Sequence, residues 1–223
     1  MATLQNTLFK MKKLLFFLLF APITVVANFY PGTIILNDGT VKIGWVQPPP
    51  FSSYQEILFK LDLEKTSQSF HINDVNKFEI INANKLKILF TTVILAEFKP
   101  FDTTVIIINK KKSWVRVIKD DNLKLYATFD EFMPIIGLEP LYLDVNSTTK
   151  FYLKKPNKNF ALYFFLTKGS GVRISDFSGL KKLIHLHFKE DCPKILSLYS
   201  KPDFKEHGVI YIVDLYNKNC FVD

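Results

Sequence analysis

Clustered histidines are the first candidates for chemistry in this 223-residue chain. His185 and His187 lie near Glu190, Asp191 and Cys192, and side chains of these types can bind a metal ion. The surrounding pattern predicts a helix, however, and residues two apart on a helix point about 200° away from each other. We therefore interpret the segment as a docking helix with one partly buried and one exposed histidine, and assign no metal ligand.

Paired acids are the second candidates. Asp62 with Glu64, and Asp130 with Glu131, could serve as the two carboxylates of a glycosidase. Such carboxylates must converge across a cleft at about 5–9 Å, which a sequence does not show. The local patterns predict a water-facing strand and a turn, so no catalytic residue is assigned.

A short glycine-serine segment, Gly169-Ser170-Gly171, is the third candidate. A serine nucleophile turn needs Gly-x-Ser-x-Gly between a strand and a helix, and phosphate-binding loops need a longer glycine spacing. The segment is predicted to be a plain loop between the last strand and the first helix, so no cofactor-binding residue is assigned.

Short strands dominate the chain that would hold these groups. Thr33–Leu36 and Val41–Trp45 flank Asn37-Asp38-Gly39, and Asp-Gly supplies the positive φ angles of a tight hairpin turn. Further strand patterns follow at spacings of about 8–12 residues, with no helical pattern between them. Among them, Lys110–Lys112 is expected to form a turn after the apolar run Val105–Ile108. The pattern is typical of an antiparallel β-sandwich or an open barrel.

Helical spacing replaces strand alternation near Ser175. One helix is predicted from Phe177 to Phe188, a second from Asp191-Cys192-Pro193 to about Tyr199, and a third from Pro202-Asp203 to about Tyr216. The predicted fold class is therefore α+β: a β-rich body over residues 28–170 and a three-helix tail over residues 171–223 packed on it.

The leading segment has the three parts of a secretory signal peptide. Lys12 and Lys13 precede an apolar run that ends at Val25-Val26-Ala27. The run is shorter than the roughly 20 apolar residues that span a bilayer. Residues 1–27 are therefore predicted to be removed on export to the periplasm, the cell envelope or the medium, and Met11 is an alternative start. No transmembrane helix is predicted in the mature chain.

Cys192 and Cys220 are the two cysteines of the chain. An even count in an exported protein favours a disulfide, and an antiparallel pair of helices would bring the two positions together. Such a bond would stabilise the fold by roughly 3–4 kcal/mol in the chain-entropy model. Two buried thiols or a redox pair are the alternatives, and the wide spacing is unlike the Cys-x-x-Cys of redox pairs.

The formal net charge of +8 comes almost entirely from lysine. Arg116 and Arg173 are the only arginines. Recognition of nucleic acids relies on the planar fork of arginine, so no nucleic-acid partner is predicted. The lysines are interpreted as a solvated surface with a weak attraction for anionic polymers or lipid headgroups.

Aromatic residues cluster in one late strand pair. An exposed aromatic strip there could bind sugars or a protein partner, but aromatics in alternating strands usually belong to a core. The residues concerned are Tyr152, Phe160, Tyr163, Phe164 and Phe165.

Several short motifs together carry a family resemblance. They are Tyr30-Pro31-Gly32-Thr33-Ile34-Ile35, Asn37-Asp38-Gly39, Asp74–Phe78, Asp191-Cys192-Pro193, and Leu215-Tyr216-Asn217 with Cys220. With these the chain resembles uncharacterised exported β-rich proteins of Bacteroidota that end in an Asp-Cys-Pro…Tyr-Asn-x-x-Cys helical tail. The resemblance implies an envelope or secreted location, a β-rich body and a helical tail that bears the cysteine pair.

The leading functional hypothesis is a non-enzymatic binding or structural module. It would bind an unidentified protein, polysaccharide or membrane surface, because no group of residues is arranged for catalysis while the fold signals agree with one another. The alternative is a hydrolase that acts on an extracellular polymer through carboxylates.

Overall fold

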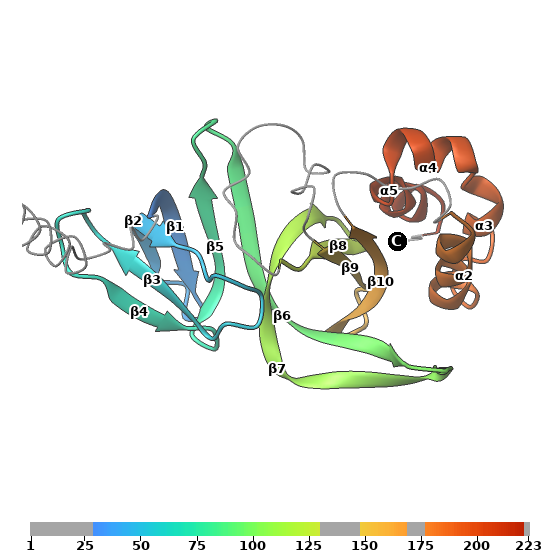
Figure 1. Cartoon of the computed structure of the whole chain (residues 1–223), viewed down its shortest axis with the longest axis horizontal. Coiled ribbons are helices and arrows are strands. Elements are labelled where there is room, and N and C mark those ends of the chain that lie inside the picture. The colour runs from blue at the N-terminus through green and yellow to red at the C-terminus, as the bar shows by residue number, and fades with distance from the viewer. Residues whose placement is uncertain (1–28, 130–147, 169–176, 221–223) are drawn as a thin grey trace, which may run out of the picture.

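The computed structural model describes residues 29–129, 148–168 and 177–220, and one ten-stranded sheet organises them (Figure 1). The strands are β1 (Tyr30–Leu36), β2 (Val41–Gln47), β3 (Glu56–Lys60), β4 (Gln68–His71), β5 (Val75–Ile81), β6 (Lys87–Lys99), β7 (Asp102–Asp120), β8 (Lys124–Ala127), β9 (Thr148–Lys154) and β10 (Phe160–Lys168). Their order in the sheet is β10-β9-β8-β7-β6-β5-β1-β2-β3-β4. With the helices that follow, this confirms the predicted α+β class.

The strands β6 to β10 curl into a closed barrel. The barrel closes because β10 also pairs with β6, with Phe160 opposite Ile94 and Leu162 opposite Ala96. This closing pair is parallel, whereas every other pairing in the described sheet is antiparallel. Of the two predicted architectures, the molecule adopts the barrel.

Alternating side chains on the barrel strands belong to two different cores. On β8, Leu125 and Ala127 pack toward the helices, while Tyr126 between them points to the barrel interior. The interior core consists of Val93, Leu95, Val115, Tyr126, Tyr152 and Ala161. The barrel is therefore filled by side chains and is not a channel.

The strands β1 to β5 form the other half of the molecule around a separate core. Ile34, Phe78 and Trp114 are fully buried there. Gly32 and Gly44 face each other across β1 and β2, and a Cβ atom on either would lie 2.3 Å from a main-chain oxygen of the neighbouring strand. Glycine at these two positions lets the strands approach closely enough to curl.

Local signals place several elements as predicted. The turn between β1 and β2 is formed by Asp38 and Gly39, with Gly39 at a φ of 86°. The first helix, α2, spans Phe177–Phe188, as its apolar spacing indicates. The hairpin of β9 and β10 turns at Pro156 and Asn157, where proline and asparagine favour a turn.

The helical tail continues with α3 (Ile195–Leu198), α4 (Lys201–His207) and α5 (Ile210–Asn219). The third predicted helix is thus divided in two, because Gly208 has a φ of 60° and its N–H caps α4. Ser200 and Asp203 form a capping box at the start of α4. Figure 1 shows the helices on the side of the barrel opposite β1 to β5.

Two predictions about strand ends are wrong. Lys110–Lys112 does not form a turn but continues the long strand β7, and the chain reverses at Pro100 and Phe101. The alternation of apolar residues from Ile57 to Leu63 predicts a strand through Leu63, whereas β3 ends at Lys60. A run of lysines does not by itself end a strand, and an alternation of apolar residues does not by itself extend one. The hydrogen bonds from neighbouring strands determine where a strand ends.

Candidate functional site

The hairpin of β6 and β7 projects from the barrel on the side of the helices (Figure 1). Its two-residue loop places Pro100 first and Phe101 second, with Phe101 at a φ of 65°. Proline followed by a positive φ is the pattern of a type II turn, in which glycine usually holds the second position. The next residue, Asp102, accepts hydrogen bonds from the N–H (3.2 Å) and hydroxyl (2.6 Å) of Thr104.

A run of aliphatic side chains is exposed on this hairpin. Residues 103–111 of β7 are all exposed. Val105, Ile106, Ile107 and Ile108 are 41, 40, 50 and 49% exposed. Successive residues of a strand point to opposite faces, so both faces of the hairpin carry exposed aliphatic groups.

Along this stretch β7 has a strand neighbour on one side only. β6 pairs with β7 between Asp102 and Arg116, although the register of this pairing shifts at two points between residues 102 and 112. β8 pairs with β7 only from Arg116 to Asp120. We call the side of residues 103–111 that faces away from β6 the β7 edge. No described strand pairs with the β7 edge, so alternate N–H and C=O groups there are available to another strand.

The hairpin is held in place by the barrel and by α2 along its outer part, where Glu97 lies opposite Ile107. The carboxylate of Glu97 accepts hydrogen bonds from the Tyr152 hydroxyl (3.0 Å) and the Lys150 ammonium (3.1 Å). The ring of Phe98 packs edge-on against His187, with 5.6 Å between centroids. The β7 edge is therefore presented by an anchored hairpin, which lowers the entropic cost of binding to it.

Charge is distributed unevenly along the β7 edge. Lys110 and Lys111 are exposed at one end, and Asp102 lies at the other. Within the described ranges, neither lysine takes part in an ion pair. The edge is thus basic at the barrel end and apolar in the middle, while at the tip Asp102 lies opposite Lys99 of β6.

The two clustered histidines of α2 do not form a metal site. His185 is exposed, while His187 is 7% exposed and its Nε2 donates to the carbonyl oxygen of Tyr163 at 2.8 Å. Burial lowers the pKa of His187 to about 4, so the ring is neutral at pH 7. The described residues contain no group of three or more potential ligands. The predicted contrast of one buried and one exposed histidine is confirmed.

The predicted disulfide between Cys192 and Cys220 is present. Their Cα atoms are 5.6 Å apart, and the bond joins the segment after α2 to the end of α5. Next to it, Lys155 of the β9–β10 loop forms an ion pair with Asp191 at 2.7 Å, and the Tyr216 hydroxyl donates to the same carboxylate at 3.0 Å. The disulfide thus closes a helical tail that polar contacts also fasten to the barrel.

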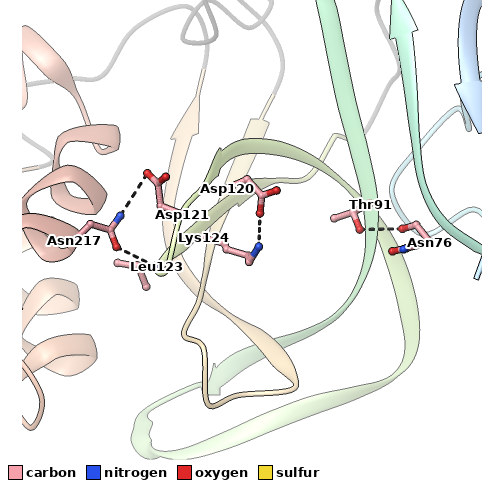
Figure 2. Close-up of polar contacts among 7 residues, drawn as sticks. All are labelled: Asn76, Thr91, Asp120, Asp121, Leu123, Lys124 and Asn217. Atoms are coloured by element: carbon pink, nitrogen blue, oxygen red, sulfur yellow. Dashed lines mark hydrogen bonds and ion pairs between the residues drawn. The ribbon is translucent and has the colours of Figure 1, made fainter. Parts of the chain in front are cut away.

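A polar hollow of about 620 Å³ lies between the β7–β8 turn and α5. Asn217 accepts from the Leu123 N–H at 3.1 Å and lies 3.5 Å from Asp121, as Figure 2 shows. Asp120 forms an ion pair with Lys124. Because these carboxylates already have partners, the hollow is best explained as the joint between barrel and tail.

Three buried polar side-chain atoms in the described part of the chain form no hydrogen bond. They are Oε1 of Gln47, the indole nitrogen of Trp114 and one terminal nitrogen of Arg116. Burial also lowers the pKa of Arg116. A buried guanidinium nitrogen without a hydrogen-bond partner lowers the stability of the fold.

Of the acids suggested for a hydrolase, one pair lies among the described residues. Asp62 and Glu64 are both exposed on the connection between β3 and β4. Asp130 and Glu131, the Gly169-Ser170-Gly171 segment and the predicted signal peptide lie outside the described residues.

The aromatic cluster belongs mainly to the cores. Tyr152, Phe164 and Phe165 are buried, and Phe160 and Tyr163 are half-buried. They therefore do not form an exposed strip for sugar binding.

Searches with protein-family models, curated proteins and solved structures give no match for this chain. The helices in the described ranges are all too short or too polar to cross a bilayer. Function must therefore be argued from the surface itself.

Sequence reasoning missed the β7 edge as a site. The run Val105–Ile108 lacks alternation, which is typical of strands buried on both faces. One signal was present: no glycine or proline separates Ile108 from Ser113, so nothing required a turn at the lysines.

Proposed function

We propose that this protein is an exported, non-enzymatic binding module whose β7 edge receives an extended strand of a protein partner. The observation that carries the proposal is the run of exposed residues 103–111, which has no described strand beside it on the side away from β6. Long apolar edges are usually shortened, covered or charged, because they pair readily with other chains. An apolar edge left open is the starting point for strand addition.

The chemistry of the edge favours a protein strand over a polysaccharide. Sugars are commonly bound on exposed aromatic faces, and the clustered aromatics are largely buried. Aliphatic β-branched residues such as Val105 and Ile107 instead pack well against the same residue types on a neighbouring strand.

A membrane surface is disfavoured for the same hairpin. If Ile106 and Ile107 entered the hydrocarbon, the free main-chain groups of the β7 edge would enter with them. Each unpaired group costs several kcal/mol there, and open sheet edges therefore do not occur in contact with lipid tails.

Two features support export. The leading segment has the basic, apolar and small-residue parts of a signal peptide. The Cys192–Cys220 disulfide is typical of proteins in an oxidising compartment, since cytosolic thiols are kept reduced.

Export is tested by expressing the full chain in its source cell and sequencing the N-terminus of the protein in each fraction. The expected product begins near Asn28, is found outside the cytosol and has no thiol that reacts with an alkylating agent. An unprocessed chain with two free thiols in the cytosol would refute export.

Strand addition is tested with a synthetic ten-residue peptide that has acidic residues at its N-terminal end followed by alternating valine and threonine. Paired antiparallel, its acids would lie opposite Lys110 and Lys111. Binding should slow hydrogen exchange at alternate amides of residues 103–111 and should be lost when the peptide's ladder-forming nitrogens are methylated.

The matched variants for this test are Ile107→Lys, which charges the edge, and Ile43→Lys. Ile43 is 72% exposed on β2, which has a neighbour on both sides. Only the Ile107 variant should weaken peptide binding. Equal binding by both variants would reject the β7 edge as the site.

The carboxylate hydrolase makes a different prediction. It would turn over an extracellular polymer and lose that activity with a single change at Asp62 or Glu64. Robust turnover with this dependence would replace the binding-module proposal.

A further inference from the structure

We propose that Arg116 and Trp114 form a binding site for a small carboxylate anion on the outer side of the barrel wall. The guanidinium of Arg116 would hold the two carboxylate oxygens, and the indole N–H of Trp114 would donate to one of them. Neither residue belongs to the β7 edge, so this site is separate from the one proposed for a partner strand.

The side chains of Trp114 and Arg116 lie on the same face of β7. Trp114 pairs with Thr92 of β6, Arg116 pairs with Phe90, and no register shift falls between them. Strand faces therefore alternate over this stretch, and Val115 between them belongs to the barrel interior. The Cα atoms of the two residues are about 6.6 Å apart at about 3.3 Å per residue, so one small anion is within reach of both side chains.

Arg116 lies where the two largest cores of the molecule meet. Its neighbour on β6 is Phe90, which belongs to the core of the N-terminal half. Its neighbour on β8 is Ala127, which belongs to the core shared by the barrel and the helices. These neighbours are only 2 and 3% exposed. The positive charge of Arg116 is thus held beside apolar side chains.

No group in the described part of the chain compensates this buried charge. Arg116 takes part in none of the ion pairs there, and its Nη1 is buried without a hydrogen bond. Burial is the only cause that shifts the pKa of Arg116, so no neighbouring acid offsets it. The group stays charged all the same, because arginine does not lose its proton in proteins. Buried charges are normally paired, which leaves the counter-charge to a ligand.

The chemistry of the two side chains selects a carboxylate. A guanidinium and an indole offer only donors, so the ligand must accept hydrogen bonds. A carboxylate meets a guanidinium through two parallel hydrogen bonds, and its single charge neutralises that of Arg116. A phosphate dianion would leave a net negative charge beside apolar residues, which costs free energy. Arg116 is half-buried, so a small ion can reach its side chain from solvent.

The test follows the two indole N–H signals of the folded protein by NMR while sodium acetate is added at neutral pH and constant ionic strength. The chain has two tryptophans, and Trp45 on β2 serves as the internal control. We expect the Trp114 signal to shift and to saturate by about 100 mM acetate, as a millimolar dissociation constant requires. The Trp45 signal should show no saturating shift.

Three variants define the site. Arg116→Met should weaken acetate binding by about tenfold or more, because the guanidinium supplies the charge and two of the hydrogen bonds. Arg116→Lys keeps the charge without the planar fork and should bind acetate more weakly than the wild type. Lys77→Met removes an exposed lysine of β5 and should leave the dissociation constant unchanged. Acetate should also raise the midpoint of urea unfolding for the wild type and not for Arg116→Met.

Three results would overturn the inference. If chloride or phosphate shifts the Trp114 signal as strongly as acetate at equal concentration, the site holds an adventitious ion only. If no anion shifts the signal, ordered water is the partner of the two nitrogens. If acetate binds equally well to the wild type and to both Arg116 variants, the carboxylate lies elsewhere. The comparison of anions on the wild type is decisive even if Arg116→Met does not fold.

Discussion

Lowering the pH toward 5 should destabilise this protein through His187, the buried histidine of α2. Its Nε2 donates to the Tyr163 carbonyl, and its ring is surrounded by Phe98, Phe164 and Phe188. A carbonyl oxygen only accepts hydrogen bonds, so the neutral ring carries its proton on Nε2. Protonation would place a charge on Nδ1 inside an aromatic environment.

The magnitude follows from proton linkage. Burial lowers the pKa of His187 from 6.5 to about 4 in the folded protein. Between these values the unfolded chain binds a proton that the folded chain does not, so the free energy of unfolding falls as the pH falls, by about 1.4 kcal/mol per pH unit. The contribution is complete above pH 6.5, and about 2 kcal/mol of it is lost at pH 5.

Two charged groups near the ring act in opposite directions. The Lys155 ammonium donates to the carbonyl oxygen of His187 at 2.6 Å and lowers the pKa, while Asp191 raises it. Because Lys155 and Asp191 form an ion pair at 2.7 Å, their effects largely cancel and burial remains the main cause.

The assay is urea unfolding at about pH 7.5 and about pH 5.0 for the wild type, His187→Gln and His185→Gln. Glutamine at position 187 keeps a donor for the Tyr163 carbonyl but does not titrate. The loss of unfolding free energy on acidification should be about 2 kcal/mol smaller for His187→Gln than for the wild type. The exposed His185 control should behave like the wild type. Equal losses in all three proteins, or a His187 pKa near 6.5 by NMR, would refute the reasoning.

Three further predictions concern stability in urea. Replacing Cys192 and Cys220 by serine should lower the unfolding free energy by about 3.6 kcal/mol for a loop of 28 residues, and reduction of the wild type should have the same effect. Gly44→Ala should cost about 3 kcal/mol, because its Cβ would lie 2.3 Å from a main-chain oxygen, whereas Gly179→Ala in α2 meets nothing within 4 Å and should stabilise by about 0.5–1 kcal/mol. Arg116→Met should raise stability by about 1 kcal/mol by removing a buried, unpartnered guanidinium nitrogen; a decrease would show that this nitrogen has a partner in solution.

Much of the fold is visible in local patterns because local chemistry forms it. Asp38 and Gly39 meet the backbone requirement of a tight turn, and the apolar spacing of α2 marks the face that packs on the barrel. The disulfide could be predicted from only two cysteines and a predicted export signal, and the structure contains it. Gly208 shows the limit of this reasoning. The helical spacing of apolar residues continues past Gly208, but the backbone conformation of this residue ends α4 and separates it from α5.

The amino-acid sequence by itself determined the alternation of short strands, the helical tail and the pairing of its two sulfurs, because each depends on residue type and nearby spacing. Only the tertiary structure decided that β10 closes the barrel beside β6 and that β7 continues through Lys110–Lys112. The same applies to the β7 edge: a run such as Val105–Ile108 has one appearance in sequence whether another strand covers it or not. The exposure of a residue depends on what packs against it, and strand pairing between distant parts of the chain determines this packing.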